Sequence, residues 1–163
     1  MIEMQVAGIA IDGGTRNPVI LLRDSSQRRQ LPIFISPEQS RTIRAVLDGE
    51  RTTRPMTHDL IVSMMNAWDM KLQRVVIHAL RDNTFYAVMT MGRGKSKKEI
   101  DARPSDAISV ALRVNAPIWV MEEVILDAAM PVDREADIAE KEAFHAFLSS
   151  ISPADFAERG RSV

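Results

Sequence analysis

The pattern of hydrophobic and polar residues occurs twice along the chain. In residues 5–49 and again in residues 73–116, three apolar segments rich in β-branched and aromatic residues precede a segment with helical spacing. Each half is therefore predicted to form three β-strands and one α-helix. Corresponding residues keep a nearly constant separation in the two halves; the pairs are Gln5 with Gln73, Asn17 with Asn83, and Pro37 with Pro104.

Turn residues separate the predicted strands, and apolar spacing defines the predicted helices. Residues 12–14, 81–83 and 92–94 include Gly, Asp and Asn, which tolerate turn geometry. Apolar residues recur at helical intervals after Pro37 and again after Pro104. The second of these helices is apolar on nearly all sides, so we expect it to be the buried one.

Two further elements are predicted outside the repeat. A helix at residues 57–68 is indicated by apolar residues that share one face, namely Leu60, Ile61, Met64, Met65 and Trp68. Residues 117–120 follow the second unit and consist of proline and three apolar residues. This segment is predicted to be a buried strand.

A change of character at residue 133 divides the chain. The following segment is charged, and apolar residues then recur at the spacing of an amphipathic helix, namely Phe144, Phe147, Leu148 and Ile151. We therefore predict an α/β architecture, a mixed α+β domain over residues 1–132, in which two tandem βββα units surround mixed or antiparallel sheets. Residues 133–163 are predicted to form a charged linker and an amphipathic C-terminal tail.

Composition restricts the possible function classes. The chain has 163 residues, of which 45% are hydrophobic and 26% are charged, so it can bury a substantial core. The absence of cysteine excludes disulfides, cysteine nucleophiles and thiolate metal sites. The sequence shows neither a secretory signal pattern nor an apolar run of transmembrane length. We therefore expect a cytoplasmic protein with no membrane partner.

The charge of the chain is nearly balanced, but its basic residues are clustered. The formal net charge is −1, which counts against a dedicated nucleic-acid binder. Basic residues gather at positions 28–29, 51–54 and 93–98. Such patches can contact phosphate in a neutral protein, although they are also common in solvated loops. Glycine-rich phosphate loops, nucleophile elbows and dinucleotide-binding fingerprints are absent from the sequence.

The segment DARPSDA, residues 101–107, places two acids and an arginine between a predicted strand and a predicted helix. Asp101 ends the strand, Arg103 lies in the turn, and Asp106 occupies the first helical turn. Carboxylates can hold a metal that activates water, while arginine or a helix N-terminus can hold a phosphate. A purely structural role stays open, because Pro104 suits the first helical position and Asp106 complements the helix dipole.

The segment RPMTHDL, residues 54–60, is a second candidate. Thr57 is predicted to be the helix N-cap, with His58 and Asp59 in the first turn. Histidine beside aspartate suggests a metal ligand or a general base. Metal sites need three or four ligands, so the alternative is a capped helix with a hydrogen-bonded surface histidine. A third segment, ISPEQS at residues 35–40, predicts only a helix start with a capping box.

Five motifs, taken in order, resemble those of the bifunctional nuclease (BFN) family over residues 4–130: RRQLPIFIS, RPMTHDL, LRDNTFYAVM, DARPSDAISVALR, and API followed by VMEEVI. The tail FHAFLSSISPADF is similar to that of actinobacterial members. The resemblance implies a mixed α/β fold, an oligomer, and activity on both DNA and RNA. This chain has Gln39 and Ser40 where members usually have Glu and Ala, so one family carboxylate is missing. The motif positions carried over are Arg54, Thr57, His58, Asp59, Arg103, Ser105 and Asp106.

We therefore predict a nuclease that hydrolyses phosphodiester bonds of DNA and RNA with a divalent metal, Mg²⁺ or Mn²⁺. The expected catalytic residues are Asp101, Asp106, Asp59 and His58, and the expected metal ligands among them are Asp101 and Asp106. Substrate contacts are expected from Arg54, Arg103, Ser105 and Thr57. The alternative is a non-catalytic regulatory module that binds a protein or nucleic-acid partner. A homo-oligomer, most simply a dimer, is expected in either case.

Overall fold

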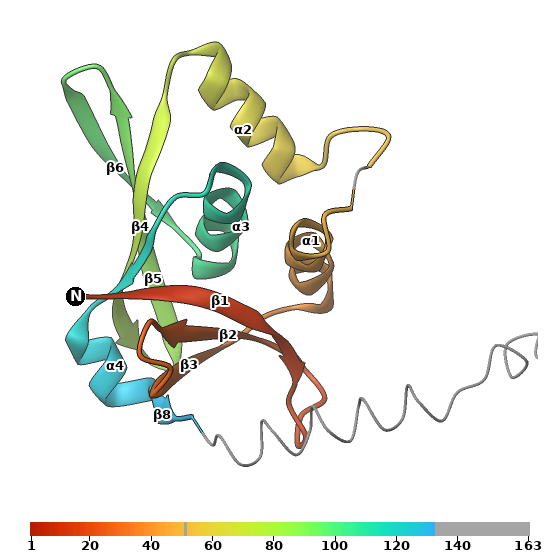
Figure 1. The fold of residues 1–163 in the computed structure, drawn as a ribbon, viewed down its shortest axis with the longest axis vertical. Helices are drawn as coiled ribbons and strands as arrows, with labels where there is room; N and C mark the ends of the chain where they lie inside the picture. Colours follow the sequence, from red (N-terminus) through yellow and green to blue (C-terminus); the bar gives the residue numbers. More distant parts are fainter. Residues whose placement is uncertain (51, 133–163) are drawn as a thin grey trace, which may run out of the picture. The chain divides into compact units, whose positions relative to one another are not determined.

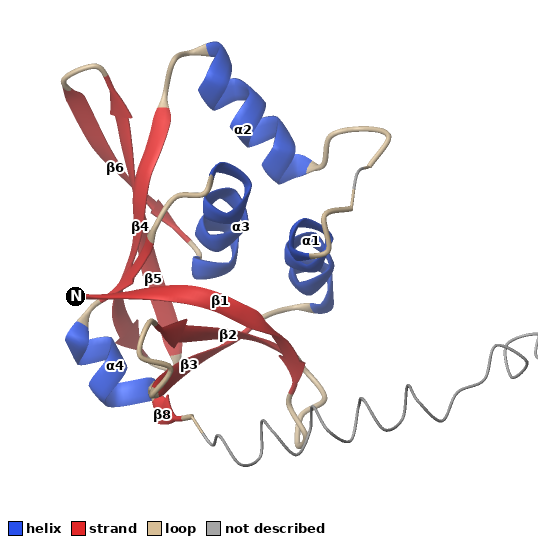
Figure 2. Cartoon of the chain, viewed as in Figure 1, coloured by secondary structure: helices blue, strands red, loops and turns tan. Residues whose placement is uncertain are grey.

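Two antiparallel meanders of three strands form the two halves of one sheet (Figures 1 and 2). The structure is a computed structural model that describes residues 1–50 and 52–132. The first meander comprises β1 (Ile2–Ile11), β2 (Pro18–Asp24) and β3 (Arg29–Phe34), and the second comprises β4 (Lys71–Arg81), β5 (Thr84–Arg93) and β6 (Ser96–Ala102). Each meander leads into a helix, α1 (Pro37–Leu47) or α3 (Pro104–Val114). The predicted order of three strands and one helix is confirmed in both halves.

A short strand, β7 (Ile118–Val120), joins the two meanders. It lies antiparallel to β1 and parallel to β4, which gives the strand order β6-β5-β4-β7-β1-β2-β3-β8 in the described part of the chain. Ile118 and Val120 are buried, so the predicted buried strand is confirmed. At the far end of the sheet, β8 (Met130–Pro131) pairs with β3.

The hairpin turns form at the predicted turn residues, except that the turn between β5 and β6 lies slightly later in the sequence than predicted. Asp82 and Asn83 both have positive φ angles, 47° and 57°, and connect β4 to β5 in a two-residue turn. The next turn is formed by Gly94 and Lys95, whereas Gly92 stays inside β5. A Cβ atom at Gly92 would overlap the amide nitrogen of Gln73 on the neighbouring strand. Glycine therefore marks a close side-chain approach at this position and not a turn.

Helix α3 forms the centre of the core. It packs against α1, α2, β4 and β5, and four of its apolar residues are almost fully buried, namely Ala107, Ile108, Val110 and Ala111. The helix ends at Asn115, whose φ of 53° is the left-handed conformation that commonly terminates helices. The prediction that this helix is the buried one is confirmed.

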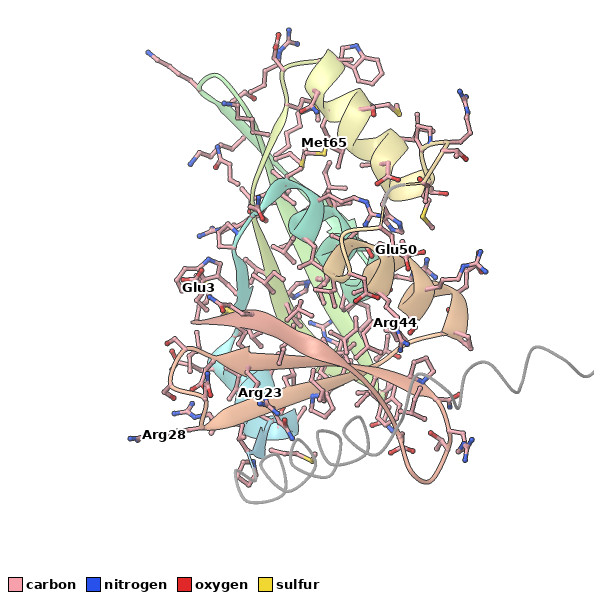
Figure 3. All side chains as sticks on the ribbon, turned by 45° about the vertical axis from the view of Figure 1, so that its right-hand side comes forward. Glu3, Arg23, Arg28, Arg44, Glu50 and Met65 are labelled. Atoms are coloured by element: carbon pink, nitrogen blue, oxygen red, sulfur yellow. The ribbon has the colours of Figure 1, made fainter. Side chains whose placement is uncertain are left out.

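Helix α2 (Thr57–Ala67) forms where it is predicted, but most of its apolar face is not covered by the described residues. Met65 is its buried residue and points inward from α2 (Figure 3). Leu60, Met64 and Trp68 remain 54%, 45% and 55% exposed. The amphipathic pattern therefore predicted the helix correctly and its burial only in part.

Two elements were not predicted. Helix α4 (Glu122–Ala128) buries Val124 and Ile125 and packs on β4 and β3, while β8 has only two residues. A helix of seven residues and a strand of two are both too short to show a recognisable hydrophobic period in the sequence. Residues Met1–Pro131 form one compact unit, and the predicted linker and amphipathic tail at residues 133–163 lie outside the described residues. Within residues 1–50 and 52–132, no helix is long and apolar enough to span a bilayer.

Candidate functional site

A groove with a volume of about 950 Å³ lies against the helices α1, α2 and α3 and the strands β5 and β6. Its apolar part includes six methionines, Met56, Met64, Met65, Met70, Met89 and Met91. Its polar part includes His58, Arg103 and Asp106 at the starts of α2 and α3, together with the charged residues Glu38 and Arg41 of α1. The groove therefore combines an adaptable apolar surface with a small group of ionisable side chains.

The polar part of the groove contains a hydrogen-bonded series of three residues. Nε2 of His58 lies 3.2 Å from Oδ1 of Asp106, although the two residues are 48 positions apart. Nε of Arg103 donates to Oδ2 of the same carboxylate at 2.6 Å. His58 lies in the first turn of α2, Arg103 is the N-cap of α3, and Asp106 lies in the first turn of α3. The starts of two helices thus bring the two predicted motifs together.

Asp106 is an ionised carboxylate at neutral pH. Burial alone would raise its pKa, but hydrogen bonds and charge from Arg103, and then from His58, hold the pKa below its ordinary value. The side chain of Asp106 is 30% exposed, that of His58 is 13% exposed, and that of Arg103 is 71% exposed. Asp106 therefore lies between a largely enclosed imidazole and an accessible guanidinium.

Asp59 is bound by other groups and does not join this series. Its Oδ1 accepts a hydrogen bond of 2.5 Å from Nε of Arg113, and its Oδ2 accepts one of 2.8 Å from the backbone N–H of Met56. The bond from Arg113 is the main reason why the pKa of Asp59 is lowered. The prediction that Thr57 is the N-cap is wrong, because Met56 holds that position and Thr57 is the first helical residue. The Asp59 carboxylate therefore binds the backbone N–H of the N-cap residue, Met56.

Ser105 is held by α1. Nε2 of Gln39 donates to Oγ of Ser105 at 2.8 Å, and Ser105 is almost fully buried. Oε1 of Gln39 accepts from the N–H of Ser36, whose hydroxyl accepts from the N–H of Gln39, so the predicted capping box is confirmed. The Gln39 amide thus caps α1 with its oxygen and donates to Ser105 with its nitrogen.

Asp101 lies away from the groove. Along β6 it alternates with Ile100 and Ala102, which both line the groove, so its side chain lies on the opposite face of the sheet. The structure therefore does not bring Asp101 to Asp106. Arg54 is exposed in the loop before α2 and does not line the groove, while Thr57 does.

Comparison with known proteins establishes the family. Residues 20–133, which include both motifs, match the model of the bifunctional nuclease domain. The chain belongs to the bifunctional nuclease domain family. It is 38% identical over 162 residues to an uncharacterized protein of Mycobacterium tuberculosis, covering 94% of this chain and 97% of that protein. It is 23% identical over 124 residues to Bifunctional nuclease 1 of Oryza sativa subsp. japonica, covering 74% of this chain and 38% of that protein.

The side chains of this bifunctional nuclease domain do not fit a divalent metal held by one chain. Both carboxylate oxygens of Asp106 and of Asp59 already accept hydrogen bonds, and Asp101 lies on the other face of the sheet. Mg²⁺ and Mn²⁺ need several oxygen ligands around one point. Among residues 1–50 and 52–132, no three histidine or acidic side chains are grouped closely enough to hold a metal. The predicted ligand pair of Asp101 and Asp106 therefore has no support in the geometry.

One residue of the site, Arg113, and one contact, that of Gln39 with Ser105, were missed in the sequence. Arg113 pairs with Asp59 across 54 positions, and its side chain is only 8% exposed. Gln39 connects α1 to the start of α3. A signal for Arg113 exists, since a cation in the last turn of an otherwise apolar helix requires a partner. The residues near Arg113 in the sequence do not indicate which carboxylate is its partner.

Proposed function

We propose that this protein hydrolyses phosphodiester bonds of DNA and RNA at the polar part of the groove. The observation that supports this proposal most directly is the series His58, Asp106 and Arg103, which joins a base, a carboxylate and a cation at the starts of two helices. Membership of the family supports the reaction class, because rice relatives carry the name bifunctional nuclease. The closer mycobacterial relative is uncharacterized and adds no activity.

His58 serves as the general base. Its Nε2 faces Asp106, so the neutral ring donates Nε2–H to the carboxylate and keeps a lone pair on Nδ1. Asp106 holds the ring in this tautomer and stabilises the imidazolium that forms when Nδ1 takes a proton. An imidazole ring can both accept and donate a proton, which suits proton transfer in both directions.

Arg103 contacts the phosphate. Its Nε is used by Asp106, and the guanidinium keeps further N–H donors on an exposed side chain. A guanidinium presents parallel donors that match two phosphate oxygens. The hydrogen bond that Arg103 donates to Asp106 therefore orients the guanidinium, and Asp106 also binds the base that activates water.

The reaction needs one water molecule for each bond cleaved. The water oxygen forms a bond to phosphorus while its proton passes to Nδ1 of His58. The bond from phosphorus to the leaving sugar oxygen breaks, and that oxygen takes the proton back from the imidazolium. The products are a phosphate monoester and a hydroxyl group. No step is assigned to a metal, because the donor groups of one chain do not fit one.

A second candidate function is supported by the apolar part of the groove. Six methionines line it, and methionine side chains adapt to partners of different shape. In this alternative the groove binds an apolar segment of a protein partner, and His58, Arg103 and Asp106 only fix the starts of the helices. The protein is then a non-catalytic regulatory module.

Binding of a labelled single-stranded oligonucleotide at several salt concentrations tests the proposal. We expect the logarithm of the affinity to fall with the logarithm of the salt concentration, with a slope of about −0.7 for each phosphate contacted. Arg103→Gln should make the slope less negative by about 0.7 for each phosphate that the variant no longer binds. Arg16→Gln is the matched control, since Arg16 is exposed in the loop between β1 and β2. Affinity that does not depend on salt, or a slope unchanged by Arg103→Gln, contradicts phosphate binding here and favours the second candidate.

A further inference from the structure

Strand β6 is an open edge of the sheet. In the described part of the chain its only neighbour is β5, and six of its seven residues are exposed. The other edge is protected, because β8 covers Arg29 and Gln30 of β3, and Pro32 has no N–H to offer. An uncovered edge presents unpaired peptide groups to any strand that matches it.

The turn before β6 determines which peptide groups point outward. Arg93 and Ser96 are partners across a two-residue turn, so the peptide groups of Ser96 face β5. Directions alternate along an antiparallel pair. The N–H and C=O groups of Lys97, Glu99 and Asp101 therefore point away from β5, where no described strand receives them.

The same three residues carry a charge pattern that is complementary to itself. Their side chains share the face of the sheet opposite the groove, and they run from basic Lys97 to acidic Glu99 and Asp101. A second copy of β6 in the antiparallel direction runs from acidic to basic. With Glu99 at the centre, all seven residues of each strand find a partner, and Lys97 lies opposite the partner's Asp101 on both sides of the axis.

We propose that the protein forms a two-fold symmetric dimer by antiparallel pairing of β6 with β6 of a second copy, centred on Glu99. The outward peptide groups of Lys97, Glu99 and Asp101 then bind those of the partner. Two pairs of opposite charge face each other, which favours cross-strand pairing. This inference does not depend on the nuclease activity.

The two central glutamates repel each other in this register, and nearby cations offset that repulsion. Glu99 lines one shallow hollow together with Lys97 and Arg74, and among the described residues none of these three forms an ion pair. On the groove side, Lys98 faces the partner's Ile100. The lysine stem can cover this isoleucine, which is 44% exposed in the single chain.

Charge exchange across the strand pair tests the interface. The wild-type protein should have twice the 18.2 kDa mass of one chain when measured by light scattering during gel filtration. Lys97→Asp and Asp101→Lys should each raise the concentration at which half of the dimer dissociates by at least about tenfold. The double variant should restore the wild-type value. Arg16→Asp, an equal change of charge far from β6 in sequence, is the control. A wild-type monomer at every concentration, or a double variant no better than either single one, overturns the proposal.

Disulfide formation tests the register, because the chain has no cysteine of its own. Glu99→Cys places one thiol of each chain directly opposite the other, within the separation that a disulfide spans. Under mild oxidation this variant should crosslink into a dimer, whereas Lys97→Cys alone should not. Crosslinking of Lys98→Cys in place of Glu99→Cys would show a shifted register and overturn the pairing centred on Glu99. A dimer that crosslinks at none of the three positions uses another surface, which also overturns the proposal.

Discussion

Replacing His58 with alanine is expected to reduce cleavage of single-stranded DNA and RNA by about 10²–10⁴-fold, the usual contribution of a positioned acid–base group. The variant removes the imidazole that takes the proton from water. It also removes one hydrogen bond to Asp106, which costs only about 1 kcal/mol of stability. Initial cleavage rates and melting temperature are measured on the same preparation, so that loss of rate is separated from loss of fold.

His78→Ala is the matched control for His58→Ala. His78 lies on β4 and does not line the groove, so its replacement removes the same side chain away from the proposed site. The control should keep the wild-type rate. Wild-type cleavage by folded His58→Ala would show that the contact with Asp106 only joins α2 to α3. Cleavage would then depend on other residues, whereas a wild-type protein that cleaves neither DNA nor RNA would favour the regulatory-module alternative.

Replacing Asp59 with asparagine is expected to destabilise the protein without removing its activity. The change leaves the guanidinium of Arg113, whose side chain is 8% exposed, without a charged partner. Breaking a fully buried ion pair costs about 3–5 kcal/mol. Asp59 is 36% exposed and partly screened, so we expect a loss of about 2 kcal/mol. The free energy of unfolding in urea and the cleavage rate per folded molecule are the two measurements.

The effect of Asp59→Asn should depend on pH. The pKa of Asp59 in the folded protein lies below the ordinary value of 3.8, so its stabilising contribution is complete above that value. The contribution is lost as the pH falls through the folded-state pKa. Wild type and variant should therefore differ most at neutral pH and converge in acid. Asp69→Asn, in the exposed turn after α2, should show no such difference. A stable Asp59→Asn protein with a strongly reduced rate would instead make Asp59 catalytic.

The repeated βββα units could be predicted because their signals are local. Strand alternation, turn residues and a proline at each helix start all lie within a few positions of the element that they specify. The position of β7 could not be predicted in the same way. Its three residues show that it is buried, but parallel pairing with β4 and antiparallel pairing with β1 depend on how the two halves meet.

The sequence predicted several residues of the site, but it did not predict which of them contact each other. Sequence spacing shows that Asp101 and Glu99 share one face of β6, but it does not show which face the helices cover. The helices cover the other one, so proximity in sequence suggested the wrong carboxylate partner for Asp106. His58, 48 positions away, is the residue that the fold brings to it.

Local preference also failed at the start of α2. Threonine is a favoured N-cap residue, but the carboxylate of Asp59 satisfies the cap N–H of Met56 while it binds Arg113. A tertiary ion pair thus fixes the helix start one residue earlier than the preference indicates. The apolar face of the same helix predicted burial, and Leu60 and Trp68 remain exposed among the described residues.

The most direct test of the proposed catalytic site is the cleavage rate of Asp106→Asn across pH, measured in EDTA on protein with a known folded fraction. The asparagine amide can donate to Nε2 of His58 and so hold the ring in the tautomer whose Nδ1 cannot accept a proton. We predict a rate lower by about 10²-fold or more at every pH, with a melting temperature within a few degrees of wild type. A folded Asp106→Asn protein that cleaves DNA and RNA at the wild-type rate would contradict the assignment.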